Sequence, residues 1–205
     1  MKIIVIGAGA MGCLYGAYLS KHNNVTMLDV YEPQVESINQ NGITVLEEDG
    51  TEQHFSNIRA MKSGTCKEVA DLVIVFVKST HTESSLEENK ELFGENTLVM
   101  TLQNGAGNDR KIAKYVKTEN IIIGTSKHNS VNLGGGKIRH SGNGVTTIGS
   151  NLEENVHLQT VADLLSEAGF QSAVSDDIQR IIWSKLFVNL SINTFTAITE
   201  TPIAK

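Results

Sequence analysis

The chain has 205 residues, and 17 Lys and Arg stand against 23 Asp and Glu, a formal net charge of −6 at pH 7. The length suits one domain with a good core, or one domain and the start of another. The acidic balance argues against a broad nucleic-acid surface, and we expect neither a membrane span nor a signal peptide. Two cysteines without metal spacing, Cys13 and Cys66, predict free buried thiols in a reducing cytoplasm.

The first element is a short β-branched run, residues 1–6, which predicts a buried parallel strand. A GxGxxG sequence follows it and leads into a small-residue helix. Such a turn lets the backbone approach a pyrophosphate, whose charge the helix N-terminus stabilises. We therefore predict a dinucleotide-binding loop rather than an ordinary structural turn. Its residues are Gly7, Ala8, Gly9, Ala10, Met11 and Gly12.

The second strand, residues 24–29, ends on Asp29, 22 positions after Gly7. An acid at about this distance binds the adenosine ribose hydroxyls and repels a 2′-phosphate. No Lys or Arg occurs between Lys21 and Arg59, so nothing nearby in sequence would neutralise such a phosphate. These features favour NAD over NADP; the alternative is that Asp29 is a simple loop residue.

The remaining elements alternate as in βαβ units. We predict a helix at 32–41, a small hairpin from 43–46 and 54–61, and buried strands at 71–77, 97–102 and 119–124. Glycine-rich strand pieces at 125–149 indicate antiparallel strands at a sheet edge, and an amphipathic helix at 156–168 stops at Gly169. The predicted fold class is α/β, a Rossmann-type doubly wound parallel sheet with an antiparallel edge, followed by the start of an all-helical domain.

A change in composition at Ser175 predicts an N-cap there and a long helix to about Ile198. We place the domain boundary accordingly, with an NAD(P)-binding domain at 1–174 and the first helix of a helical domain at 175–205. One long helix cannot form a domain alone, so we expect this second domain to be cut short. Its apolar face favours self-association, and a homodimer is one such assembly.

Two polar segments follow strands at the edge where doubly wound sheets bind ligands. Lys78 comes directly after the third strand of the predicted sheet, where it is a ligand-binding residue or a solvated strand end. Residues 103–107, Gln-Asn-Gly-Ala-Gly, follow the next strand. A side-chain amide there, such as that of Asn104, would reach the nicotinamide ribose or the substrate; the alternative is a simple turn.

Within the last helix, Lys185, Asn189 and Asn193 recur at i, i+4 and i+8 and share one face. A partly desolvated Lys can donate a proton at neutral pH, and Asn side chains can orient a keto acid. The alternative is the solvent-facing side of a packed helix. His81, His128 and His140 lie far apart without metal-ligand spacing, so we interpret them as surface or core histidines and predict no metal site.

Together these motifs resemble the ketopantoate reductase (2-dehydropantoate 2-reductase) family, whose specific mark is the W-x-K-L-x-x-N-x-x-x-N pattern at 183–193. The resemblance implies reduction of ketopantoate to pantoate with NADPH, in the route to pantothenate and coenzyme A. It implies that Lys185 is the general acid, that Asn189 and Asn193 hold the substrate, that Asn104 contacts cofactor and substrate, and that Lys78 lies near the cofactor.

Two features depart from this family. Asp29-Val30 stands where the family commonly has an Arg for the 2′-phosphate, which favours NADH. The substrate-binding Ser and catalytic Glu of the family come from a later helical domain that this sequence lacks. Two other functions stay open: a related 2-oxo acid or opine-type dehydrogenase, and a non-catalytic dinucleotide-binding protein. The expected partner is a small 2-oxo acid, with no nucleic acid or membrane, and the expected location is cytoplasmic.

Overall fold

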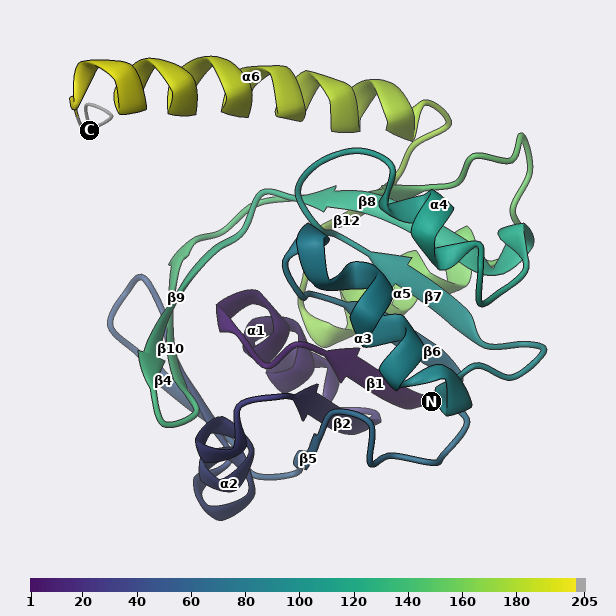
Figure 1. Cartoon of the computed structure of the whole chain (residues 1–205). Coiled ribbons are helices and arrows are strands. Elements are labelled where there is room, and N and C mark those ends of the chain that lie inside the picture. Colours follow the sequence, from purple (N-terminus) through teal and green to yellow (C-terminus); the bar gives the residue numbers. More distant parts are fainter. Residues whose placement is uncertain (202–205) are drawn as a thin grey trace.

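The computed structural model describes residues 1–201, with the exception of the Asn193 side chain (Figure 1). Its main sheet has eight strands in the order β12-β11-β8-β7-β6-β1-β2-β5. These strands are β1 (Lys2–Ile6), β2 (Asn24–Asp29), β5 (Arg59–Lys62), β6 (Leu72–Val75), β7 (Leu98–Thr101), β8 (Ile121–Ser126), β11 (Thr146–Gly149) and β12 (Ser172–Val174). From β5 to β8 all neighbours are parallel, which confirms the doubly wound Rossmann-type sheet.

Helices cover both faces of this sheet. Successive side chains of β1 point to opposite faces, so apolar side chains of this strand reach the helices on each side. Ile3 and Val5 pack with apolar residues of α1 (Ala10–Leu19) and α5 (Leu158–Ala168). Ile4 and Ile6 pack on the other face, with residues of α3 (Thr82–Glu88) and α4 (Asn108–Ile112). The strands are therefore buried on both sides, as their continuous apolar runs predict. Three short 3₁₀ turns are η1 (Ser79–His81), η2 (Lys90–Leu92) and η3 (Thr118–Asn120).

A second sheet of four strands lies beside α1 (Figure 1). Its order is β4 (Glu52–Phe55), β3 (Ile43–Leu46), β10 (Lys137–Gly142) and β9 (Asn129–Gly134). The β3–β4 pair confirms the predicted small hairpin, but residues 59–62 do not belong to it, since they form β5 in the main sheet. The prediction of antiparallel strands at 125–149 is confirmed, since β11 is antiparallel to β8 and β9 is antiparallel to β10 at the edge of its sheet. The sequence did not indicate that β9 and β10 belong to this second sheet rather than to the main one. Sequence spacing could not reveal the parallel pairing of β10 with β3.

The helix boundaries agree closely with the sequence. Helix α2 is Glu32–Asn41 as predicted, and α5 ends at Gly169 in the left-handed conformation, with φ of 105°. For the last helix the predicted cap was wrong. Asp177, and not Ser175, is the N-cap, and its carboxylate accepts a hydrogen bond from the Arg180 backbone N–H at 3.3 Å.

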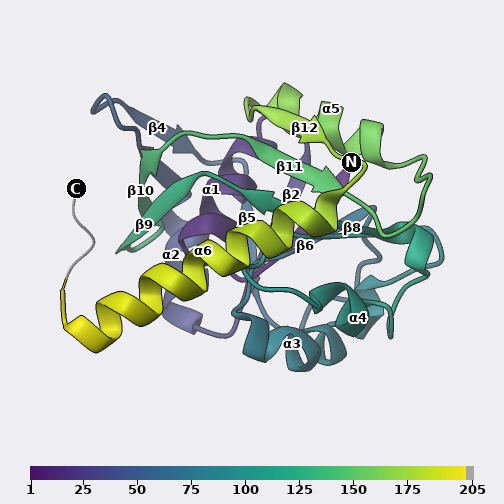
Figure 2. The same ribbon diagram turned by 90° about the horizontal axis from the view of Figure 1, so that it is seen from above.

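Helix α6 (Ile178–Thr199) runs along one side of the body, and its C-terminal half extends away from the strands (Figures 1 and 2). Ile178 is buried in the core, whereas Phe187, Phe195 and Ile198 are exposed. By length and composition α6 is long and apolar enough to span a membrane, so the expectation that no such stretch exists was wrong; one such helix is weak support for a span. The domain boundary at 174/175 stays a prediction.

Candidate functional site at the carboxyl edge of the sheet

The glycine-rich loop joins β1 to α1 through two positions that only glycine can fill. Gly7 has φ of 102°, and a Cβ atom there would lie 3.0 Å from the backbone N of Val77. A Cβ atom on Gly12 would lie 1.8 Å from the carbonyl oxygen of Gly7. Gly9, in contrast, has no heavy atom within 4 Å of such a Cβ, so its backbone is open to a ligand. The loop therefore fits a pyrophosphate as the spacing predicts.

The backbone N–H groups at the start of α1 are available to an anion. Those of Ala10 and Met11 have no backbone acceptor in the described chain, as expected for the first turn of a helix. The N–H of Ala8 donates instead to Asp29 Oδ2 at 2.7 Å, which ties the loop to the end of β2. Asp29 Oδ1 accepts from the Tyr31 N–H at 2.9 Å. Asp29 is thus a built part of the loop.

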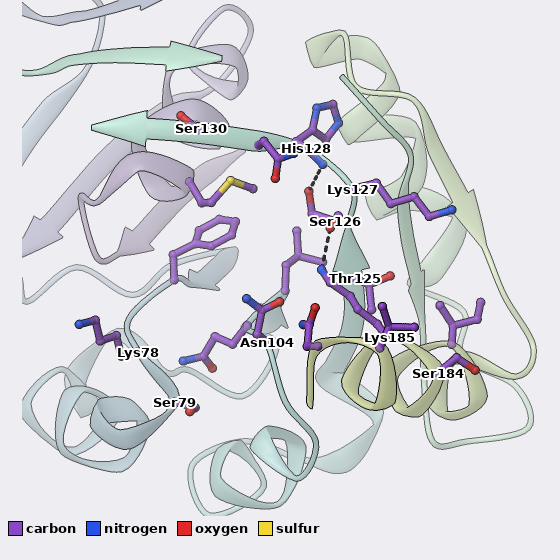
Figure 3. A pocket seen from close by; sticks show the side chains of 18 of the residues that line it. Lys78, Ser79, Asn104, Thr125, Ser126, Lys127, His128, Ser130, Ser184 and Lys185 are labelled. Atoms are coloured by element: carbon purple, nitrogen blue, oxygen red, sulfur yellow. Dashed lines mark hydrogen bonds between the residues drawn. The ribbon is translucent and has the colours of Figure 1, made fainter. Parts of the chain in front are cut away.

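A cavity of about 1440 Å³ opens where β6, β7 and β8 end and α6 crosses above them (Figure 3). Five of the predicted site residues line it. They are Met11, Lys78, Asn104, Lys185 and Asn189. The structure thus brings together residues that the sequence separates, at the edge where doubly wound sheets bind ligands.

Lys185 enters this cavity from α6. Its ammonium Nζ donates a hydrogen bond to the carbonyl oxygen of Ser126 at 2.8 Å (Figure 3). Burial lowers the pKa of Lys185 below its ordinary value, since desolvation disfavours the charged form. The side chain is therefore both oriented by the end of β8 and a better proton donor than an exposed lysine.

Two of the three members of the polar stripe on α6 line the large cavity. Asn189 lies one turn beyond Lys185 and lines the same cavity. The side chain of Asn193 lies outside the described residues, so its predicted substrate contact stays a prediction. Asn104 and Lys78 face the cavity from the ends of β7 and β6 (Figure 3). Because β5 joins the sheet, Lys78 follows the fourth parallel strand along the chain rather than the third.

Gln103, the neighbour of Asn104, has a structural role. Its amide donates to the Val77 carbonyl at 2.5 Å and to Thr82 Oγ1 at 2.9 Å, and its carbonyl accepts from Thr101 Oγ1 at 2.9 Å. These bonds fix the ends of β6 and β7 against the start of α3. Asn104 is thus the amide of this segment that is left for a ligand.

Four cations line the large cavity, and in the described chain none of them has a carboxylate within 4.0 Å. They are Lys78, Lys127, Arg180 and Lys185. Most other lysines, such as Lys62 with Glu32, form surface ion pairs. The sequence pointed to Lys78 and Lys185 only, because Lys127 and Arg180 belong to no motif. Unpaired cations in one cavity suit an anionic ligand.

A buried polar chain that sequence spacing did not reveal begins at His128, which lines the large cavity. His128 Nδ1 and His140 Nε2 are 3.0 Å apart, and His140 Nδ1 is 2.8 Å from Glu47 Oε2. Glu47 also accepts from the Tyr18 hydroxyl and the Gln53 amide. With Glu47 as acceptor, His140 donates to it and His128 donates to His140, which leaves His128 Nε2 as an acceptor without a partner among the described residues. Both histidines are buried, in agreement with the surface-or-core interpretation.

A second cavity, of about 410 Å³, lies on the other side of the glycine-rich loop. Its lining residues are Ala8, Gly9, Asp29, Tyr31, Pro33, Gln34, Asn132, Gly134 and Gly135. The loop thus separates two cavities, with Met11 in the larger and Gly9 in the smaller. A dinucleotide fits this division, with its pyrophosphate over the loop and one nucleoside on each side. The fold and the two cavities define a Rossmann-type dinucleotide-binding protein.

Comparison with known proteins identifies the family. Residues 3–153 match the family model described as "Ketopantoate reductase PanE/ApbA". A 2-dehydropantoate 2-reductase of Halobacterium salinarum is 32% identical over 98% of the chain and 66% of its own length. One of Lactococcus lactis is 33% identical over 100% of the chain and 66% of its own length. The chain belongs to the ketopantoate reductase family, and it spans about two thirds of the length of these relatives.

Solved structures agree with this membership. A 2-dehydropantoate 2-reductase from Geobacter metallireducens has a TM-score of 0.90 and 28% identity, over 98% of this chain and 67% of that one. A D-mandelate dehydrogenase in a ternary structure with NADH and anilino(oxo)acetate has a TM-score of 0.90 and 29% identity, over 98% and 65%. The fold of this chain is therefore similar both to a 2-dehydropantoate 2-reductase and to a D-mandelate dehydrogenase.

Proposed function

We propose that this chain holds the cofactor site and part of the active site of an NAD(P)H-dependent reductase that converts 2-dehydropantoate to pantoate. The observation that carries the proposal is Lys185, a half-buried lysine with a lowered pKa, in one cavity with Asn104 and Asn189. Membership of the ketopantoate reductase family supports the substrate. The reaction would belong to pantothenate and coenzyme A biosynthesis in the cytoplasm.

A bound reduced nicotinamide dinucleotide supplies the hydride. Lys185 donates a proton from Nζ to the keto oxygen of the substrate, and its positive charge stabilises the alkoxide that develops there. The Ser126 carbonyl holds the ammonium in place by accepting a hydrogen bond from one of the three N–H groups of Lys185. The other two N–H groups are left for the substrate. Asn189 and Asn104 orient the 2-oxo acid from the two sides of the cavity. We assign Asn193 to the same role from the resemblance alone.

The cofactor proposal is NADH in preference to NADPH. Asp29 supports it, because a carboxylate at the end of β2 accepts ribose hydroxyls and repels a 2′-phosphate. The D-mandelate dehydrogenase that resembles this chain was solved with NADH. In this assignment residues 7–12 bind the pyrophosphate and Lys78 lies at the nicotinamide side.

A second candidate is reduction of a bulkier 2-oxo acid. The anilino(oxo)acetate in the D-mandelate dehydrogenase structure favours it, and the large cavity has room for an aromatic side chain. An opine-type dehydrogenase or a non-catalytic dinucleotide-binding protein are the remaining alternatives from the sequence.

The test is oxidation of NADH and of NADPH by the 205-residue chain, with ketopantoate and with phenylglyoxylate as alternative substrates. Faster oxidation with ketopantoate and NADH supports both parts of the proposal. A preference for phenylglyoxylate supports the second candidate instead. Cofactor binding without oxidation by either acid contradicts a reductase activity of this chain and favours the non-catalytic alternative.

A further inference from the structure

The small cavity has walls from both sheets. One wall is the glycine-rich loop, the end of β2 and the start of α2, as in any Rossmann-type ribose site. The other wall is the end of β9 and the turn into β10, together called the β9–β10 turn, of which Asn132, Gly134 and Gly135 line the cavity. No part of the dinucleotide-binding motif predicts this second wall.

We propose that the β9–β10 turn is part of the adenosine ribose site and that Asn132, opposite Asp29, makes this site select a free 2′-hydroxyl. The inference rests on the proposed use of a nicotinamide cofactor and deepens it. The turn acts as a specificity determinant and has no part in the chemical step.

Hydrogen bonding at the cavity suits hydroxyl groups. Asp29 Oδ2 accepts a hydrogen bond from the Ala8 N–H, and Oδ1 accepts one from the Tyr31 N–H. Each oxygen can accept a further hydrogen bond from a hydroxyl group. Asn132 Oδ1 accepts from the Gly134 N–H at 2.8 Å, which fixes the side chain within the turn. The Asn132 amide nitrogen has no hydrogen-bond partner in the described chain, so it can donate to a ribose oxygen.

The charges at the cavity exclude a phosphate. Asp29 is an acid, and the lining residues include no Lys or Arg. Lys62 lies opposite Asp29 in the register of β5 with β2, but its Nζ forms an ion pair with Glu32 Oε1 at 2.5 Å. A 2′-phosphate would bring up to two negative charges next to Asp29 without a free cation to meet them. A 2′-hydroxyl meets no such repulsion.

The glycines of the turn keep the cavity open. Gly134 and Gly135 have φ of 88° and 59°, which other residues rarely adopt. A Cβ atom on Gly134 would meet no heavy atom within 4 Å. Asn132 has no positive φ, since Glu200 is the one described non-glycine residue that does. Position 132 is therefore where a side chain can change without backbone strain.

The experiment measures binding by calorimetry, with ADP-ribose and 2′-phospho-ADP-ribose as probes and the 205-residue chain as it is. We expect the chain to prefer ADP-ribose by about tenfold or more, as like charges placed together are disfavoured. Asn132→Arg should shift the ratio at least about tenfold towards the phosphorylated probe, because it places a cation opposite Asp29. Asn132→Asp, which keeps an acceptor for the Gly134 N–H, should strengthen the preference for ADP-ribose.

The matched control is Leu133→Arg, which adds the same charge at the next position of β9. Leu133 is exposed and does not line the cavity, so the ratio should stay near that of the unchanged chain. Equal shifts from Asn132→Arg and Leu133→Arg would overturn the inference, as would a preference of the unchanged chain for the phosphorylated probe or no binding of either. If the ratios shift as expected while no 2-oxo acid is reduced, the inference stands and the proposed reductase function fails.

Discussion

At the scale of single residues, the contacts of Lys185 decide what the large cavity can do. Its spacing with Asn189 was visible in the sequence, because a helix repeats every 3.6 residues and places both on one face. Its acceptor, the Ser126 carbonyl, was not, because a backbone atom carries no sequence signature and β8 precedes α6 by more than fifty residues. The pairing of His128 with His140 was hidden because it depends on the antiparallel pairing of β9 with β10, which brings residues twelve positions apart together.

Lys185→Ala is expected to lower kcat by about 100- to 10,000-fold, the usual contribution of a positioned general acid. NADH binding, followed by the change in its fluorescence, should stay close to that of the unchanged chain. Because the general acid must be protonated, kcat of the unchanged chain should fall as pH rises through the lowered pKa of Lys185. Lys185→Arg is the control that keeps the charge, and an unchanged kcat in Lys185→Ala would exclude it as the acid.

The lowered pKa of His128 predicts that the folded chain loses stability in acid. Burial and the neighbouring His140 lower its pKa to about 4, from an ordinary value of 6.5. As pH falls from 6.5 towards 4, the unfolded chain binds a proton at this residue that the folded chain does not bind. The free energy of unfolding should therefore fall across this window. Urea unfolding at several pH values checks this, and His128→Gln, which does not titrate, should flatten the dependence.

At the scale of elements, regular features were predictable and pairings between distant strands were not. Helix α2 and the strand-loop-helix unit at the N-terminus follow from local periodicity and from the glycine spacing. The small sheet required β10 to pair with β3 in parallel, a contact between segments far apart in the sequence. No local pattern distinguishes it from an edge of the main sheet. The second wall of the ribose cavity was missed as a direct consequence.

The second and third glycines of the loop, Gly9 and Gly12, are expected to differ in their response to substitution. Gly12→Ala places a Cβ atom 1.8 Å from the Gly7 carbonyl oxygen, so the turn must shift. The free energy of unfolding should fall by about 1–3 kcal/mol, and ADP-ribose affinity should fall with it. Gly9→Ala meets no atom within 4 Å, so stability should stay unchanged while the new methyl group blocks the pyrophosphate. Equal loss of stability in both variants would contradict this account.

At the scale of the whole molecule, most of α6 is left uncovered by the other described elements. Phe187 is 62% exposed and Phe195 is 66% exposed, on a helix whose first residue is buried in the core. Soluble proteins rarely leave apolar side chains gathered in this way without a partner. The apolar composition of the helix was evident from the sequence, but its exposure was not, since exposure depends on which other elements reach it.

We expect the isolated chain to self-associate through α6. Sedimentation velocity should show species larger than a monomer that grow with protein concentration. The double variant Phe187→Glu, Phe195→Glu should reduce this association, with little change in the free energy of unfolding because both side chains are exposed. Ser191→Glu, at another exposed position of α6, is the control for added charge alone. Association that is equal in both variants would place the contact elsewhere.

The four unpaired cations of the large cavity have a kinetic consequence. The molecule as a whole repels anions, because its net charge is −6. A dinucleotide or a 2-oxo acid is drawn towards the edge where Lys78, Lys127, Arg180 and Lys185 concentrate positive potential. Encounter should therefore be guided to one entrance and slow as added salt shortens the reach of these charges, to about 8 Å at 0.15 M ionic strength. Dissociation should respond much less, so ionic strength would act on this protein through capture of its ligands rather than through their retention.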